Sequence, residues 1–177
     1  MGKRDNVVLA DIEVYPNFFM LGIKGFNNKI TTIFEISEER NDIKELIEFL
    51  IEFKGYLITF NGIYYDTVVL KHIRDNYKML STLTAQEACW MIKQFNNKVI
   101  DSDENFDSIK IYKWAKQSWT NIDLFLYWSK MIRISKHIGL KSLGIQLGYP
   151  VVQELPYHHE KHFYYFRLLK WNKALLQ

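Results

Sequence analysis

The segment VVLADIEVYPNFFMLGIKGFNNKITTIFEI, residues 7–36, is rich in the β-branched and aromatic residues that favour β-strands. The turn-forming residues Phe26-Asn27-Asn28 separate its second and third apolar runs. We therefore expect strands at 7–15, 18–25 and 29–36. Because the connections between them are short, these strands should form an antiparallel three-stranded start to the fold.

Helical spacing begins after this segment. Residues 38–54 place five apolar side chains on one helical face and most glutamates on the other. A short β-type run follows at 55–61, and further helices are expected from Asp66, over 84–95 and ahead of Gly148. The order β-β-β-α-β predicts an α/β fold whose central mixed sheet opens with three antiparallel strands and is flanked by helices.

Composition limits the class of protein. The chain has 177 residues, 3 prolines and 8 glycines, with no repeat or linker-like tract, so one domain over 1–177 is expected. A net charge of +3 permits nucleic-acid contact without requiring it. The single cysteine, Cys89, excludes an intramolecular disulfide and a multi-cysteine zinc site. No targeting or membrane-spanning pattern is evident, so we expect a cytoplasmic protein with no membrane partner.

Two carboxylates lie on the otherwise apolar first strand. Asp11 and Glu13 are two residues apart, and side chains alternate across a strand, so both should point to the same face. Like charges side by side repel, which a folded protein tolerates when a cation lies between them, and oxygen ligands favour Mg²⁺ or Mn²⁺. The alternative, a solvent-exposed face of an edge strand, remains open at this point.

A second polar group follows the strand expected at 55–61. In Asn61-Gly62-Ile63-Tyr64-Tyr65-Asp66, a glycine-containing turn leads to an acid at or near the start of a helix. An ordinary helix N-cap would explain this aspartate by itself. Core packing would likewise explain one of the two tyrosines.

Together the two groups resemble the RNase H-like DEDD superfamily of 3′→5′ exonucleases, and in particular the exonuclease modules associated with phage-type DNA polymerases. Four segments carry the resemblance, in the family's order: DIEVYPNFF (11–19), LITFNGIYYDTVVL (57–70), NIDLF (121–125) and GLKSLGIQLGYPVVQELPY (139–157). The first two are fairly specific in combination. The last two are weaker individually.

The resemblance implies roles for the acids. Asp11 and Glu13 match the first exonuclease motif and Asp66 the acid of the second, where the family binds two divalent metals, Mg²⁺ or Mn²⁺. One metal activates a water for attack on the terminal phosphodiester, and the other stabilises the leaving 3′ oxygen. Asn61 and Tyr65 match positions that hold the 3′-terminal nucleotides.

Other matched residues have plainer alternatives. Asp123 matches an acid that is not a usual metal ligand in the family, and helix capping is the favoured interpretation. Lys141, with Arg133 and Lys136, could contact the phosphate backbone, and a solvated helix face is an equal alternative.

The fourth acid of the DEDD pattern is missing. The family would place a Tyr-Asn-x-x-Asp-like segment about where this chain has Trp171-Asn172-Lys173-Ala174-Leu175, and no aspartate follows Asp123. Three explanations compete: a truncation or frameshift after Tyr157, substitution by Glu160, or loss of catalysis with binding kept. Residues 157–177 are therefore an atypical C-terminal tail.

The expected function is thus a metal-dependent 3′→5′ exonuclease of phage replication type, weakened by the missing acid, in the host cytoplasm if phage-encoded. Its expected partners are single-stranded DNA or a DNA 3′ end and a DNA polymerase or another replication protein. The alternative is a catalytically inactive RNase H-like module that binds single-stranded nucleic acid or a host or phage protein.

Overall fold

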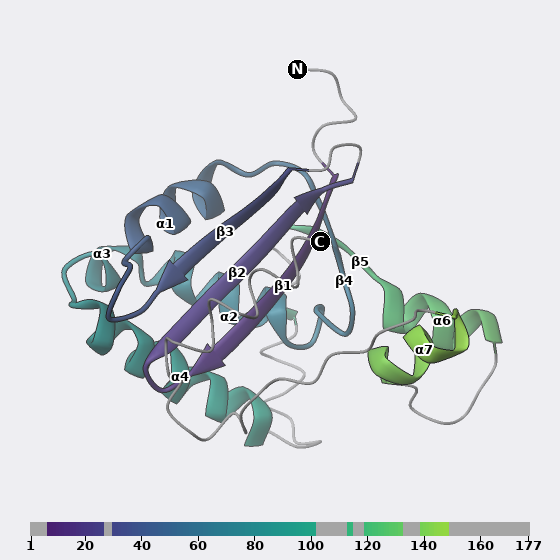
Figure 1. Ribbon diagram of the computed structural model, residues 1–177. Coiled ribbons are helices and arrows are strands. Elements are labelled where there is room, and N and C mark those ends of the chain that lie inside the picture. The colour runs from purple at the N-terminus through teal and green to yellow at the C-terminus, as the bar shows by residue number, and fades with distance from the viewer. Residues whose placement is uncertain (1–6, 27–29, 102–112, 115–118, 133–138, 149–177) are drawn as a thin grey trace.

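The computed structural model describes residues 7–26, 30–101, 113–114, 119–132 and 139–148 (Figure 1). Its centre is a five-stranded sheet with the strand order β3-β2-β1-β4-β5. The strands are β1 (Val7–Tyr15), β2 (Phe18–Gly25), β3 (Thr31–Ile36), β4 (Tyr56–Thr59) and β5 (Thr120–Asp123).

The sheet combines two kinds of pairing. β1 pairs with β2, and β2 with β3, in antiparallel fashion, whereas β4 runs parallel to both β1 and β5. The α/β class and the mixed sheet are therefore confirmed, and the antiparallel pairing is confined to β1–β3. On the parallel side β1 pairs with β4 only from Val7 to Leu9. The second half of β1 thus continues beyond the end of β4.

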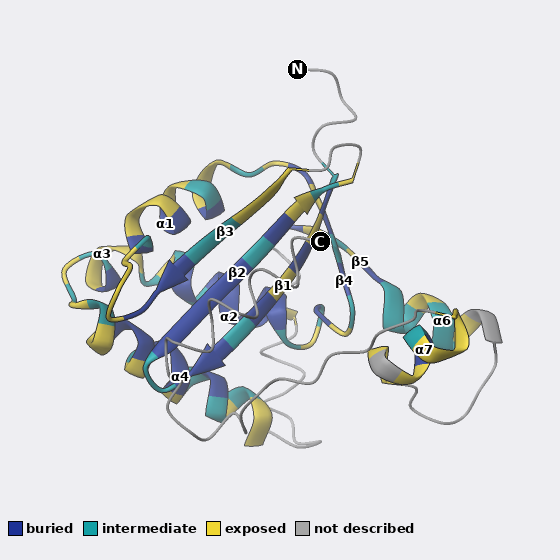
Figure 2. Ribbon diagram, in the orientation of Figure 1, coloured by how far each residue is buried: buried dark blue, intermediate teal, exposed yellow. Residues whose placement is uncertain are grey.

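Three helices cover one face of this sheet: α1 (Ile43–Glu52), α2 (Asp66–Asp75) and α4 (Ala85–Asp101) (Figures 1 and 2). The short α3 (Tyr77–Leu80) joins α2 to α4. After β5, α6 (Leu124–Ile132) and α7 (Leu140–Gln146) lie beside the sheet at the end of that strand. No helix among those described is long and apolar enough to span a membrane.

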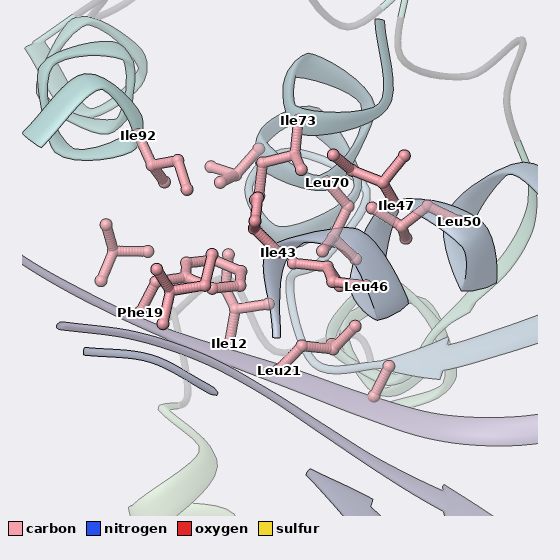
Figure 3. Close-up of a cluster of buried hydrophobic side chains, with 14 of the residues drawn as sticks. Ile12, Phe19, Leu21, Ile43, Leu46, Ile47, Leu50, Leu70, Ile73 and Ile92 are labelled. Atoms are coloured by element: carbon pink, nitrogen blue, oxygen red, sulfur yellow. The ribbon is translucent and has the colours of Figure 1, made fainter. Parts of the chain in front are cut away.

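The core lies between the sheet and these three helices. Alternate residues of β1 and β2 point into it, where they meet the inward faces of the helices (Figure 3). Full burial of each large aliphatic or aromatic side chain contributes about 1.5–3 kcal/mol. The labelled members are Ile12, Phe19 and Leu21 from the sheet, Ile43, Leu46, Ile47 and Leu50 from α1, Leu70 and Ile73 from α2, and Ile92 from α4.

Two expected helix boundaries were wrong. The first helix begins at Ile43, not near residue 38, because the Ser37 hydroxyl accepts the backbone N–H groups of Glu39 and Arg40 and holds them in a turn. The helix expected to end near residue 95 continues to Asp101. Its capping box is confirmed, since Thr84 and Glu87 exchange side chain–backbone hydrogen bonds at its start.

Candidate functional site

Asp11 and Glu13 point from the same face of β1, as their spacing predicts. The residues between and around them, Val8, Ala10, Ile12 and Val14, are buried against the helices on the opposite face. Asp11 lies directly across from Gly22 of β2 in the sheet. A Cβ atom built on Gly22 would have Asp11 O as its nearest neighbour, at 3.9 Å, so this part of the sheet surface is open beside the Asp11 backbone.

Asp66 is the first residue of α2, and its carboxylate turns to β1 instead of capping its own helix. The residue preceding the helix is Tyr65, and no side-chain hydrogen bond caps this helix. Asp66 Oδ1 instead accepts the backbone N–H of Ile12 at 3.2 Å, where β1 has continued beyond its pairing with β4. The helix-start acid is thereby fixed to the residue between Asp11 and Glu13.

Besides desolvation, repulsion among the three carboxyl groups contributes to the raised pKa values of Glu13 and Asp66. Desolvation, followed by repulsion from Asp11 and Asp66, raises the pKa of Glu13 to about 8. Burial raises the pKa of Asp66 to about 7, with Asp11 the largest charge contribution. Asp11 is exposed when the whole residue is considered. The protein atoms around its carboxyl group nevertheless exclude enough water to raise its pKa as well. Carboxylates with raised pKa values in one neighbourhood are typical of functional sites.

The donor set fits a hard divalent cation chemically. Carboxylate oxygen atoms are the ligands that Mg²⁺ and Mn²⁺ prefer, and a cation would relieve the repulsion that raises these pKa values. The side-chain arrangement is less favourable: within the described residues, no three His, Cys, Asp or Glu side chains are grouped so that they could hold a metal ion. The structure thus places the acids near one another without a formed metal site.

Residues 60–65 connect β4 to α2 and are called the β4–α2 turn below. This turn contains Asn61 and Tyr65, the two residues predicted to hold nucleotides. Asn61 is exposed and has a φ of +62°, a left-handed conformation that asparagine tolerates better than most residues. Gly62 is buried in the same turn, and its carbonyl accepts the Thr67 N–H at 2.8 Å. This bond joins the turn to the first turn of α2.

The two tyrosines of the turn differ in environment. Tyr65, predicted to contact nucleotides, is half-buried against the core, and its hydroxyl donates to Asn96 Oδ1 of α4 at 2.6 Å. Burial and the nearby carboxylates raise its pKa. Tyr64 is 48% exposed. Core packing therefore applies to Tyr65, although the residue stays partly exposed.

Asn96 is a residue that sequence reasoning missed. It is 1% exposed and lies on the face of α4 that also carries Cys89 and Ile92. An amide on the apolar face of an amphipathic helix is the signal that could have indicated it, because a buried amide needs a partner.

Asp123 caps α6, as the favoured interpretation expected. Its Oδ1 accepts the N–H groups of Phe125 at 2.9 Å and Leu126 at 3.4 Å. Cys89 is buried in the core, where desolvation raises its thiol pKa to about 12 and disfavours the reactive thiolate.

The other predicted residues cannot be placed. Arg133, Lys136, Glu160, the segment 171–175 and the whole 157–177 tail lie outside the described residues, as does the side chain of Lys141. The described part of the site therefore consists of three acids and the β4–α2 turn. Comparisons with protein-family models, with curated proteins and with solved structures found no match to this chain.

Proposed function

We propose that this chain is an RNase H-like 3′→5′ exonuclease domain that acts on DNA 3′ ends. The fold assignment is supported by the mixed sheet, in which three antiparallel strands precede two strands parallel to β1, with helices between. It is also supported by the location of the acids, two on the first strand and one at the start of the helix that follows the fourth strand.

One observation carries the proposed chemistry. Asp66 is hydrogen-bonded to the backbone between Asp11 and Glu13, and the charges of all three carboxyl groups couple. Without a cation this cluster costs stability, because ionising it buries like charges together. We infer that Asp11, Glu13 and Asp66 bind Mg²⁺ or Mn²⁺, ions that when bound supply an activated water and stabilise a leaving 3′ oxygen.

The chain's own groups position the substrate. Asn61 is exposed in the turn that leads to Asp66, and an amide there is suited to hydrogen bonding with a terminal nucleotide. Tyr65 keeps its hydroxyl on Asn96 and offers the rest of its ring for packing. A replication polymerase is the partner class that this activity fits, with the domain removing mismatched 3′-terminal nucleotides.

A second function, binding without catalysis, is favoured by one observation. Within the described residues, no three His, Cys, Asp or Glu side chains are grouped so that they could hold a metal ion. Such a module would hold single-stranded nucleic acid or a protein partner. The cluster of three acids argues against it, because a pure binder gains nothing from internal repulsion.

Degradation of a 5′-labelled single-stranded oligonucleotide tests the proposal, with Mn²⁺, Mg²⁺ or EDTA. We expect metal-dependent products that shorten from the 3′ end. The variant Asp11→Asn should lose roughly 100-fold or more of the rate, because it removes one charge from the cluster with little change in shape. The matched control is Glu48→Gln, which neutralises an exposed glutamate of α1 on the far side of the core.

The controls separate the two functions. Equal rates in Asp11→Asn and the wild type would mean that a contaminating nuclease produced the products. If no products form while the oligonucleotide is still retained on the immobilised protein, catalysis is excluded and the binding module remains.

A further inference from the structure

Asp123 makes more contacts than a helix cap needs. Besides the two N–H groups of α6, its Oδ1 accepts the backbone N–H of Asn61 at 2.9 Å and its Oδ2 accepts that of Ile63 at 3.1 Å. The side chain is 5% exposed. A single carboxylate at the end of β5 therefore holds both the start of α6 and the β4–α2 turn.

Asn121, two residues earlier on β5, makes a second connection. Its Oδ1 accepts the Thr59 hydroxyl at 2.9 Å, and its Nδ2 donates to the Thr67 hydroxyl at 2.7 Å. Thr59 ends β4 and Thr67 follows Asp66 in α2. The amide thus connects the two ends of the β4–α2 turn through buried hydroxyl groups.

Gly62 lets the β4–α2 turn pack closely against Thr59. A Cβ atom at this position would collide with the side chain of Thr59, so the turn packs directly on the end of β4. Together with the Thr67–Gly62 backbone bond, these contacts hold both ends and the middle of the turn. Asp66 follows the turn directly, so its position depends on them.

The chemistry of Asp123 fits this second task. Neutral serine, threonine or asparagine is sufficient to cap a helix, whereas burying a carboxylate costs free energy unless several donors compensate. Four backbone N–H groups do so here, and two belong to the turn. A backbone held by a charged acceptor is bound more strongly than one held by a neutral acceptor.

We propose that Asp123 is a positioning residue: through the β4–α2 turn it holds Asp66 against the backbone of β1, beside Asp11 and Glu13, where the proposed cation would bind, with Asn121 supporting the same turn. This inference rests on the proposed function. Removing an outer group that orients metal ligands typically lowers metal affinity 10- to 100-fold, which sets the expected size.

The test compares Asp123→Asn and Asn121→Ala with Thr84→Ala, which removes the cap of α4. Free Mn²⁺ is measured by electron paramagnetic resonance at a temperature where every variant is folded. We expect about 10-fold weaker Mn²⁺ binding in Asp123→Asn, a smaller loss in Asn121→Ala and none in Thr84→Ala. A purely structural role would instead lower the melting temperature of Asp123→Asn and Thr84→Ala alike and leave Mn²⁺ affinity unchanged.

A second readout keeps the inference separate from the proposed function. Amide NMR signals of Asn61, Ile63 and Asp66 should move in Asp123→Asn and stay in place in Thr84→Ala, with or without metal. Wild-type protein that binds no Mn²⁺ would overturn the proposed function, and the amide shifts would still decide whether Asp123 holds the turn. The inference would be overturned if these amide signals did not move in Asp123→Asn. It would also be overturned if folded Asp123→Asn bound Mn²⁺ as tightly as the wild type does. If Asp123→Asn does not fold, Asn121→Ala decides by the same two measurements.

Discussion

At the scale of single residues, Gly62 has no room for a side chain. We expect Gly62→Ala to lower the free energy of unfolding by about 1–3 kcal/mol, because the added methyl would overlap the Thr59 side chain. The Thr59 side chain cannot easily turn away, since it is β-branched and bound to Asn121. Urea unfolding of the variant measures this.

Gly22→Ala is the matched control. It adds the same methyl to the surface of β2, where the nearest atom would be 3.9 Å away. Stability should stay the same or rise by about 0.5 kcal/mol, since alanine restricts the unfolded chain. Equal losses in both variants would show that Gly62 has no special packing role.

At the scale of elements, α2 and α4 are joined by an aromatic contact that titrates. The His72 ring of α2 stacks on Phe95 of α4 with 3.8 Å between centroids, and burial lowers its pKa to about 4. The unfolded chain therefore binds a proton at this histidine between pH 6.5 and about 4, while the folded chain does not. Its contribution to stability is present above pH 6.5 and is lost as the pH falls.

We expect His72→Phe to remove this acid sensitivity while keeping a ring on Phe95. Between pH 6.5 and 4.5 the wild type should lose stability relative to the variant by at most about 1.4 kcal/mol per pH unit, less in practice because this half-buried site is partly screened by solvent. Thermal unfolding of both proteins across this range measures the difference. If the stability of the two proteins differed by the same amount at every pH, the lowered pKa of His72 would be contradicted.

Some strands follow from the local sequence, whereas others depend on pairing with distant parts of the chain. The bounds of β1 and β2 agree with the apolar runs, because strand propensity and flanking turns are properties of neighbouring residues. The local apolar pattern by itself did not indicate β5 as a strand. It is four residues long, TNID, with mostly polar side chains, and pairing with β4 across about sixty residues is what makes it one.

At the scale of the whole molecule, the carboxylate cluster should make stability fall as the pH rises from about 4 to 8. The folded pKa values of Glu13 and Asp66, about 8 and about 7, lie above the ordinary values of 4.5 and 3.8. The folded chain thus retains protons that the unfolded chain releases. This contribution is fully present below about pH 4 and is lost as the pH rises towards 8, by about 1.4 kcal/mol per pH unit for each retained proton.

We expect Glu13→Gln to flatten the loss of stability between pH 5 and 8, and Glu48→Gln to leave it unchanged. Urea unfolding at several pH values measures both slopes. Millimolar Mn²⁺ should raise the wild-type midpoint at pH 8 and have little effect on Glu13→Gln. Parallel pH curves for the wild type and Glu13→Gln would show that the cluster does not form in solution.

The sequence by itself determined the α/β class, the antiparallel opening, the capping box of α4 and the shared face of Asp11 and Glu13. All of these follow from side-chain period, propensity and capping within a few residues. Only the tertiary structure decided that Asp66 binds the N–H of Ile12, 54 residues away, that Tyr65 turns to Asn96, and that Asp123 holds a turn as well as a helix. Those contacts satisfy buried polar groups whose partners come from distant elements, and no local pattern specifies which donor a buried acceptor will meet.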